Sequence, residues 1–154
     1  MNTAEFAYRK TAAAAVGNGL SLLIALYDTL AGDIRRATEA ERGNQIDRRC
    51  REINHALLVI GYLEDWVSRG PGGELAAQLT AMYRSLRRDL VVAQVKRSPE
   101  MLEEQMALVL KMRAVWQAME TRAASSGPEI LPPLPAPPYL RMTAAECSAG
   151  SWSA

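Results

Sequence analysis

The stretch "GLSLLIALYDTLAGDIRRATEA", residues 19–40, begins apolar and continues into a charged segment without losing its periodicity. Apolar side chains recur at intervals of three and four residues, which places them on one face of a helix. This face consists of Leu20, Leu23, Tyr27, Leu30, Ile34 and Ala37. Because the pattern passes beyond Asp28, we expect a core helix from about Gly19 or Leu20 to about Ala40.

The same region raises the alternatives of an export signal or a membrane anchor, since the basic pair Arg9 and Lys10 precedes it. Both need a continuous apolar segment, and a spanning helix needs about 20 mostly apolar residues. Glycines and an asparagine interrupt the segment at residues 17–19, and only Leu20–Tyr27 is densely apolar. The sequence therefore favours a buried helix, with Asn18 or Ser21 as its N-cap.

Two further helices follow from the turn residues. Gly43 ends the first helix, and Asn44 is the predicted N-cap of the second, which ends at "RGPGG", residues 69–73. The apolar stripe of the second helix is Ile46, Cys50, Ile53, Leu57, Ile60, Leu63 and Val67. The third helix begins near Glu74, and its stripe is Leu75, Leu79, Met82, Leu86, Leu90 and Ala93.

The segment "KRSPEMLEE", residues 96–104, marks the start of a fourth helix. Basic residues end the third helix, Ser98 is the predicted N-cap, and Pro99 takes the first helical position. Two apolar stripes follow side by side, Leu102, Met106, Val109 and Trp116 on one and Leu108, Met112, Val115 and Met119 on the other. Short connections between consecutive helices predict an all-α, antiparallel up-down four-helix bundle.

The domain organisation follows from these elements. Residues 1–17 are expected to form a short N-terminal cap segment, and residues 18–124 the bundle. Residues 125–154 hold six of the eight prolines and are expected to form a mobile proline-rich tail.

Composition excludes several classes of function. Basic and acidic residues number 18 and 17, a balance typical of a globular protein and not of a nucleic-acid binder, and we expect neither nucleic-acid binding nor membrane insertion. Cys50 lies in a helical stripe and Cys147 in the tail, so we expect no disulfide and a cytosolic location. The single histidine, His55, cannot supply the ligands of a di-iron bundle, and we expect no cofactor, no metal and no enzymatic activity.

The fourth helix carries two apolar stripes where a bundle helix needs one, and the first helix is apolar on most sides from Leu20 to Leu30. One reading is a wide core. The other is a groove that accepts an amphipathic helix from a partner, with methionines that repack around different side chains.

Three runs resemble the bacterial flagellin-specific export chaperone family, FliS: residues 22–37, 53–67 and 72–116. The most specific pieces are the Leu-Tyr-Asp at Leu26 to Asp28, the pair Leu79 and Tyr83, and the pair Arg113 and Trp116. The resemblance implies a cytoplasmic bundle that binds the disordered C-terminal segment of flagellin in apolar grooves. It thereby prevents premature polymerisation and aids flagellar type III secretion.

The resemblance also implies a set of partner-binding residues. Tyr8 matches a tyrosine that covers part of the empty client site. The groove wall is assigned to Leu26, Ile53, Leu57, Ile60 and Tyr83, and further client contacts to Leu108, Met112 and Val115. Packing in the core of the bundle is the alternative interpretation of each of these residues. Other flagellar export or regulatory proteins are possible partners.

Two rival functions stay open from the sequence alone. A helical adaptor or regulatory protein that binds a different amphipathic partner shares the groove without requiring flagellin. A small-molecule or cofactor bundle differs in containing a bound chromophore or metal.

Overall fold

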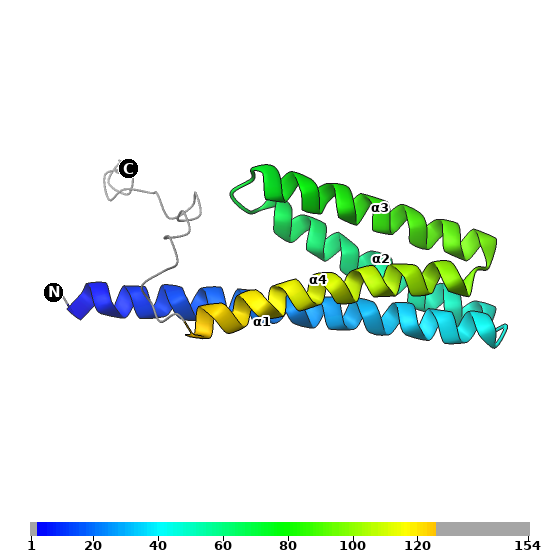
Figure 1. The fold of residues 1–154 in the computed structure, drawn as a ribbon, viewed down its shortest axis with the longest axis horizontal. Helices are drawn as coiled ribbons and strands as arrows, with labels where there is room; N and C mark the ends of the chain where they lie inside the picture. The colour runs from blue at the N-terminus through cyan, green and yellow to red at the C-terminus, as the bar shows by residue number, and fades with distance from the viewer. Residues whose placement is uncertain (1–2, 126–154) are drawn as a thin grey trace, which may run out of the picture.

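The computed structural model describes the backbone of residues 3–125 and the side chains from Gly19 to Ser125. It contains four helices in this range: α1 (Thr3–Arg42), α2 (Ile46–Ser68), α3 (Glu74–Lys96) and α4 (Pro99–Ser125). Each helix packs on the next along the chain, and α1 also packs extensively on α4, which closes the ring. Figure 1 shows α1 and α4 running alongside each other, with α2 and α3 joined by their own turn. The predicted all-α four-helix bundle is confirmed.

The first helix begins earlier than predicted. It starts at Thr3 and passes through Gly17 and Gly19 without a break, so neither Asn18 nor Ser21 is an N-cap. Alanine has the highest helix propensity, and a helical glycine costs only about 1 kcal/mol. The alanines before these glycines explain why the helix continues. The predicted tail after Ser125 lies outside the described residues.

The turn between α1 and α2 differs from the prediction at Asn44. This residue has a positive φ of 52°, and Gln45 is the residue that precedes α2. The Gln45 N–H donates to the Ala40 carbonyl at 2.8 Å and the Asn44 N–H to the Glu41 carbonyl at 3.0 Å. These two bonds form a Schellman motif, which needs a left-handed residue that asparagine tolerates. Asn44 therefore ends α1 and does not cap α2.

The start of α4 is as predicted. Ser98 Oγ accepts a hydrogen bond from the Met101 backbone N–H at 3.2 Å, and Pro99 is the first helical residue. Arg97, with a φ of 54°, ends α3 in the left-handed conformation. The sharp reversal sets α4 back along α3 and α1.

The core contains the central residues of the predicted stripes. The largest fully buried side chains are Tyr27, Tyr83, Leu23, Leu30, Ile34, Ile53, Ile60, Leu63, Leu86, Leu90, Leu102 and Val109. Two residues of the stripes on α2 and α3 differ: Ile46 and Leu75 are 50% and 60% exposed. Both lie in the first turn of their helices, at the ends of the bundle, where fewer neighbours cover them.

Candidate functional site

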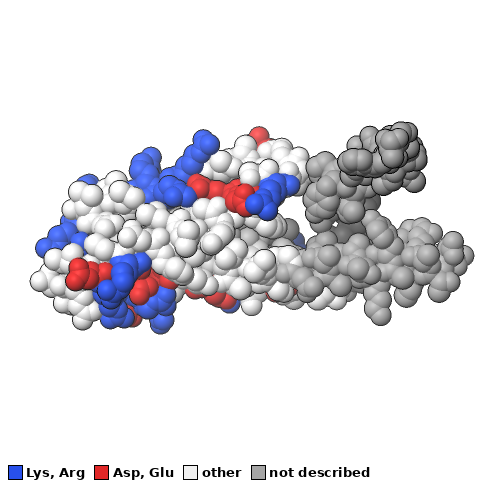
Figure 2. Space-filling model, turned by 180° about the vertical axis from the view of Figure 1, so that it is seen from behind, with Lys and Arg blue, Asp and Glu red and all other residues white. Residues whose placement is uncertain are grey.

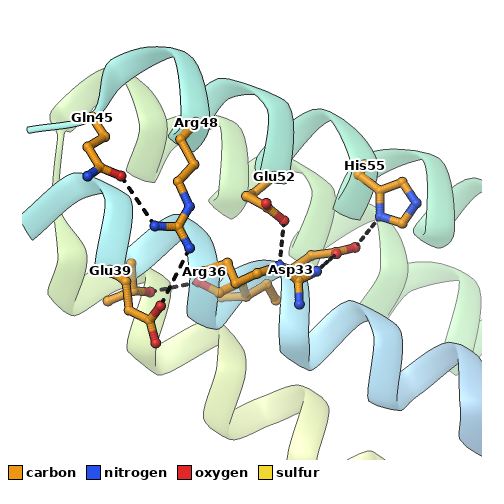
Figure 3. A network of polar contacts seen from close by, with 9 residues as sticks. Asp33, Arg36, Glu39, Gln45, Arg48, Glu52 and His55 are labelled. Atoms are coloured by element: carbon orange, nitrogen blue, oxygen red, sulfur yellow. Dashed lines mark hydrogen bonds and ion pairs between the residues drawn. The ribbon is translucent and has the colours of Figure 1, made fainter. Parts of the chain in front are cut away.

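A polar network joins α1 to α2 (Figure 3). The buried carboxylate of Asp33 accepts a hydrogen bond from Arg36, and its Oδ2 lies 2.7 Å from Nδ1 of His55. Arg36 Nε also donates to Glu52 at 2.8 Å. These contacts fix how the two antiparallel helices align, because Asp33 lies level with His55 and Arg36 with Glu52.

A second set of polar contacts joins α1 to α4. The Arg113 guanidinium binds the Asp28 carboxylate, and its Nη2 lies 3.3 Å from Oδ2. Toward the two ends, Arg42 donates to Glu103 at 2.7 Å and Ser21 to Glu120 at 2.5 Å. This flank of α4 is therefore occupied by α1.

A buried charge cluster lies at the end of the bundle that holds the α1–α2 turn. The Glu41 carboxylate binds Arg49 and accepts a hydrogen bond from Arg97 Nε at 3.1 Å. Burial acts to raise the pKa of Glu41, but hydrogen bonds from the two arginines outweigh it and hold this pKa below its ordinary value. Glu41 thus stays ionised and ties α1 to α2 and α3.

Apolar side chains that the bundle leaves uncovered gather on α2. Leu58, Tyr62 and Trp66 recur at intervals of four residues and are 55%, 57% and 43% exposed. Beside them lies a shallow, open groove of about 510 Å³ on α2, which Arg87 of α3 borders; it is called the α2–α3 groove below. It is lined by Asn54, Leu57, Leu58, Gly61, Tyr62, Asp65 and Arg87. The rear view shows uncharged surface running between groups of charged side chains (Figure 2).

The second stripe of α4 is also incompletely covered. Leu108 and Met112 are half-buried, whereas Val115 and Met119 are 52% and 43% exposed. These residues lie on the flank opposite Arg113, which faces α1, and so on the side toward α3. The α3–α4 side therefore offers a second apolar strip.

The predicted partner-binding residues fall into three groups. Ile53, Ile60 and Tyr83 are at most 1% exposed and belong to the core between the helices. Leu26, Leu57 and Met112 are half-buried and pack against that core. Leu108 is half-buried, and Val115 is exposed. The side chain of Tyr8 lies outside the described residues. The structure brings only Leu57 into the α2–α3 groove.

Sequence reasoning missed the exposed row on α2. Leu58, Tyr62 and Trp66 form a regular i, i+4, i+8 set, and this spacing was the available signal. This row lies beside the stripe of α2 that packs into the core. The core therefore does not explain why these three positions are apolar.

Sites for other chemistry are sparse in the described part of the chain. No group of three or more His, Cys, Asp or Glu side chains there could hold a metal ion. Cys50 Sγ accepts a hydrogen bond from Gln94 Nε2 at 3.3 Å. None of the helices between Thr3 and Ser125 is long and apolar enough to cross a membrane.

The fold and these surfaces define a four-helix bundle protein with apolar strips on the outside of its helix pairs. A family model described as "Flagellar protein FliS" matches residues 1–123, and the chain belongs to this family. Membership of this family supports a role as a flagellar export chaperone. The family is one of chaperones and is not known to contain enzymes. No curated protein matches the chain.

Proposed function

We propose that this protein is a cytoplasmic export chaperone that binds the disordered C-terminal segment of flagellin. The segment lies as amphipathic helices against the α2–α3 groove and the apolar strip of α4. One observation carries the proposal: the row Leu58, Tyr62 and Trp66 stays exposed beside a groove on a bundle whose core is already complete. Covering it prevents premature polymerisation and presents the client for type III secretion.

The energetics favour a long, apolar footprint. A disordered client loses conformational entropy when it folds on binding, at a cost of about 2–5 kcal/mol or more. Burial of apolar surface returns about 25 cal/mol per Å², so several hundred Å² must be covered before binding becomes favourable. One groove is too small for this, and two separated strips match a client that wraps around the bundle.

The proposed contacts follow from exposure. Five of the proposed contact residues can touch a client at the surface without any movement of the helices: Leu26, Leu57, Leu108, Met112 and Val115. The core residues Ile53, Ile60 and Tyr83 would reach a client only if the helices separated, which is an alternative mode of binding that an Ile60→Val variant tests. Displacement of Tyr8 by the client belongs to the same proposal.

The test is calorimetry of the full chain with the C-terminal segment of the flagellin from the same organism. We expect one-to-one binding with a strongly negative heat-capacity change, because apolar surface is buried. Leu58→Ala is expected to weaken binding about tenfold, or about 1.4 kcal/mol, with the free energy of unfolding changed by less than about 0.5 kcal/mol.

The matched control is Val95→Ala on α3. Val95 is 78% exposed and does not line the groove, so its removal is expected to leave the affinity unchanged. Equal weakening by both variants would contradict the groove assignment. Absence of binding by the folded wild type would contradict the flagellin assignment and favour an adaptor for another helical partner.

A further inference from the structure

Seven exposed side chains form a continuous row along the outer face of α2. They recur at intervals of four, three, four, four, three and four residues: Asp47, Arg51, Asn54, Leu58, Tyr62, Asp65 and Arg69. Because an α-helix turns once every 3.6 residues, this spacing places all seven on one face, and Arg69 directly follows the last helical residue. We call this row the α2 seam. Its members are all exposed, so the neighbouring helices leave this face free.

The charges of the α2 seam are complementary about Leu58. Arg51 and Asp65 lie seven residues before and after Leu58, and Asp47 and Arg69 lie eleven residues before and after it. Each aspartate on one side of Leu58 therefore has an arginine at the same distance on the other side. An antiparallel copy of this helix that crosses at Leu58 places an arginine opposite every aspartate of the seam.

The length of the arginine side chains suits such a crossing. At a rise of about 1.5 Å per residue, the inner charges lie about 10 Å from Leu58 along the helix axis, and the outer ones about 16 Å. Helices that pack as in a bundle cross at about 20°, so the two axes are offset sideways by about 4 Å at the inner pairs and about 6 Å at the outer pairs. Long arginine side chains span these offsets. All the ion pairs of a two-fold arrangement can therefore form together.

Neighbouring registers of the same two helices bring like charges together. A crossing moved two residues toward the N-terminus of α2 places Asp47 opposite Asp65 of the second copy. A crossing moved two residues toward the C-terminus places Arg51 opposite Arg69. Like charges directly opposite each other repel, so the charge pattern selects the crossing at Leu58.

The centre of the α2 seam is apolar and lies at the α2–α3 groove. Leu58 and Tyr62 are 55% and 57% exposed, and both line this groove together with Asn54 and Asp65. In the two-fold arrangement, Tyr62 lies opposite Asn54 of the second copy, so each Tyr62 ring meets the groove of the other copy. Burial of these side chains adds a hydrophobic contribution between the charged ends.

We propose that two copies of this chain associate through the α2 seam, antiparallel and with a two-fold axis at Leu58. The interface is isologous, because the same residues contribute from both copies. One helix face is smaller than the about 800 Å² that each partner buries in a standard interface, so we expect a weak dimer with a Kd of about 10 µM or higher. If the α2–α3 groove also binds flagellin, which rests on the proposed function, the client and the second copy exclude each other.

The test is sedimentation equilibrium of the full chain and three variants. Arg51→Asp sets an acid opposite Asp65 of the second copy at both ends of the interface, and we expect a dimer about tenfold weaker. Adding Asp65→Arg to the same chain restores both pairs with exchanged signs, and should return the Kd to within about threefold of the wild type. The matched control is Arg35→Asp, which is expected to leave the Kd unchanged. Arg35 is exposed on α1, seven residues from both Asp28 and Arg42, which bind α4.

The remaining outcomes decide between the dimer and the proposed function. A wild type that stays monomeric at about 1 mM overturns the proposal. So does a dimer that Arg51→Asp and Arg35→Asp affect equally, or one that the exchanged pair fails to restore. Flagellin is then added to the wild-type dimer. Absence of binding contradicts the proposed function and leaves the dimer supported, whereas dissociation into one-to-one complexes supports both. A client that binds without dissociating the dimer overturns their mutual exclusion.

Discussion

The hydroxyl oxygens of Tyr27 and Tyr83 lie 2.7 Å apart, and both side chains are completely buried. Tyr27 belongs to α1 and Tyr83 to α3, which lie diagonally across the ring of helices. Each hydroxyl is the partner of the other in a region lined by apolar side chains. The pair therefore fixes the relative height of two helices that share little other contact.

Removing one hydroxyl of this pair leaves the other without its partner. We expect Tyr83→Phe to lower the free energy of unfolding by about 1–3 kcal/mol, the cost of an unsatisfied buried polar group. The double variant Tyr27→Phe with Tyr83→Phe removes both hydroxyls of the pair, and its loss of stability is expected to be smaller than the sum of the two single losses. Urea denaturation of the four proteins measures this coupling. Additive losses would show that the hydroxyls do not interact. Tyr62→Phe on the exposed face is the control, with a change below about 0.5 kcal/mol.

Stability is expected to fall at high pH because of the same pair. Burial, as the largest cause, raises the pKa of both Tyr27 and Tyr83 above the unfolded value of 10.0. Since the folded-state pKa is the higher one, the stabilisation is complete below about pH 10 and is lost as the pH rises beyond it. The measurement is the free energy of unfolding between pH 8 and 11, for the wild type and the double Phe variant. An equal decline in both proteins would assign the loss to other groups.

The helical periodicity sufficed to predict the number of helices and most of their buried residues. The groove wall proposed at Ile53, Ile60 and Tyr83 came from the family resemblance, with core packing as the alternative, and the structure places these side chains inside the bundle. An apolar stripe in the sequence shows which residues share one face of a helix, but it does not show how closely the neighbouring helix packs against that face. That distance depends on packing by residues far along the chain, so the spacing of Leu58 and Trp66 marks a second apolar row without showing that it is exposed.

Helix ends were predictable only where one local signal prevailed. At Ser98 and Pro99, the cap, the proline and the acidic first turn agree, and the prediction is confirmed. At Asn44, the same side chain suits an N-cap or a left-handed helix end, and the choice depends on hydrogen bonds to Ala40 and Glu41. Local residue types do not decide between two such motifs.

Glu41 is expected to be the most sensitive charged residue in the described part of the bundle. Its carboxylate is buried between Arg49, also buried, and Arg97. Glu41→Gln leaves the Arg49 charge without compensation, and we expect a loss of about 3–5 kcal/mol in the free energy of unfolding. The control is Glu103→Gln, which breaks the exposed pair with Arg42 and is expected to cost less than about 1 kcal/mol. Similar losses in both variants would contradict a special role for the buried cluster.

A fall in pH is expected to remove the difference in stability between the wild type, with Glu41, and the Glu41→Gln variant. The pKa of Glu41 is lowered below its ordinary value of 4.5. A lowered folded-state pKa means that the stabilisation is present above about pH 4.5 and is lost as the pH falls through the folded value. The difference in unfolding free energy between wild type and Glu41→Gln should therefore shrink from pH 7 toward pH 3. A constant difference over this range would mean that packing, and not charge, sets the cost.

A last prediction separates core residues from client contacts by measuring stability and binding together. Ile60 is fully buried, so Ile60→Val is expected to lower the free energy of unfolding by about 0.5–1.5 kcal/mol and leave flagellin affinity unchanged. Val115 is 52% exposed, so Val115→Ala is expected to weaken flagellin binding while stability changes by less than about 0.5 kcal/mol. Calorimetry and urea denaturation on the same samples give both quantities. If Ile60→Val weakened the client as much as Val115→Ala in a fully folded protein, the helices would have to separate to admit flagellin. Ile60 would then be a core residue in the free protein and a client contact in the complex.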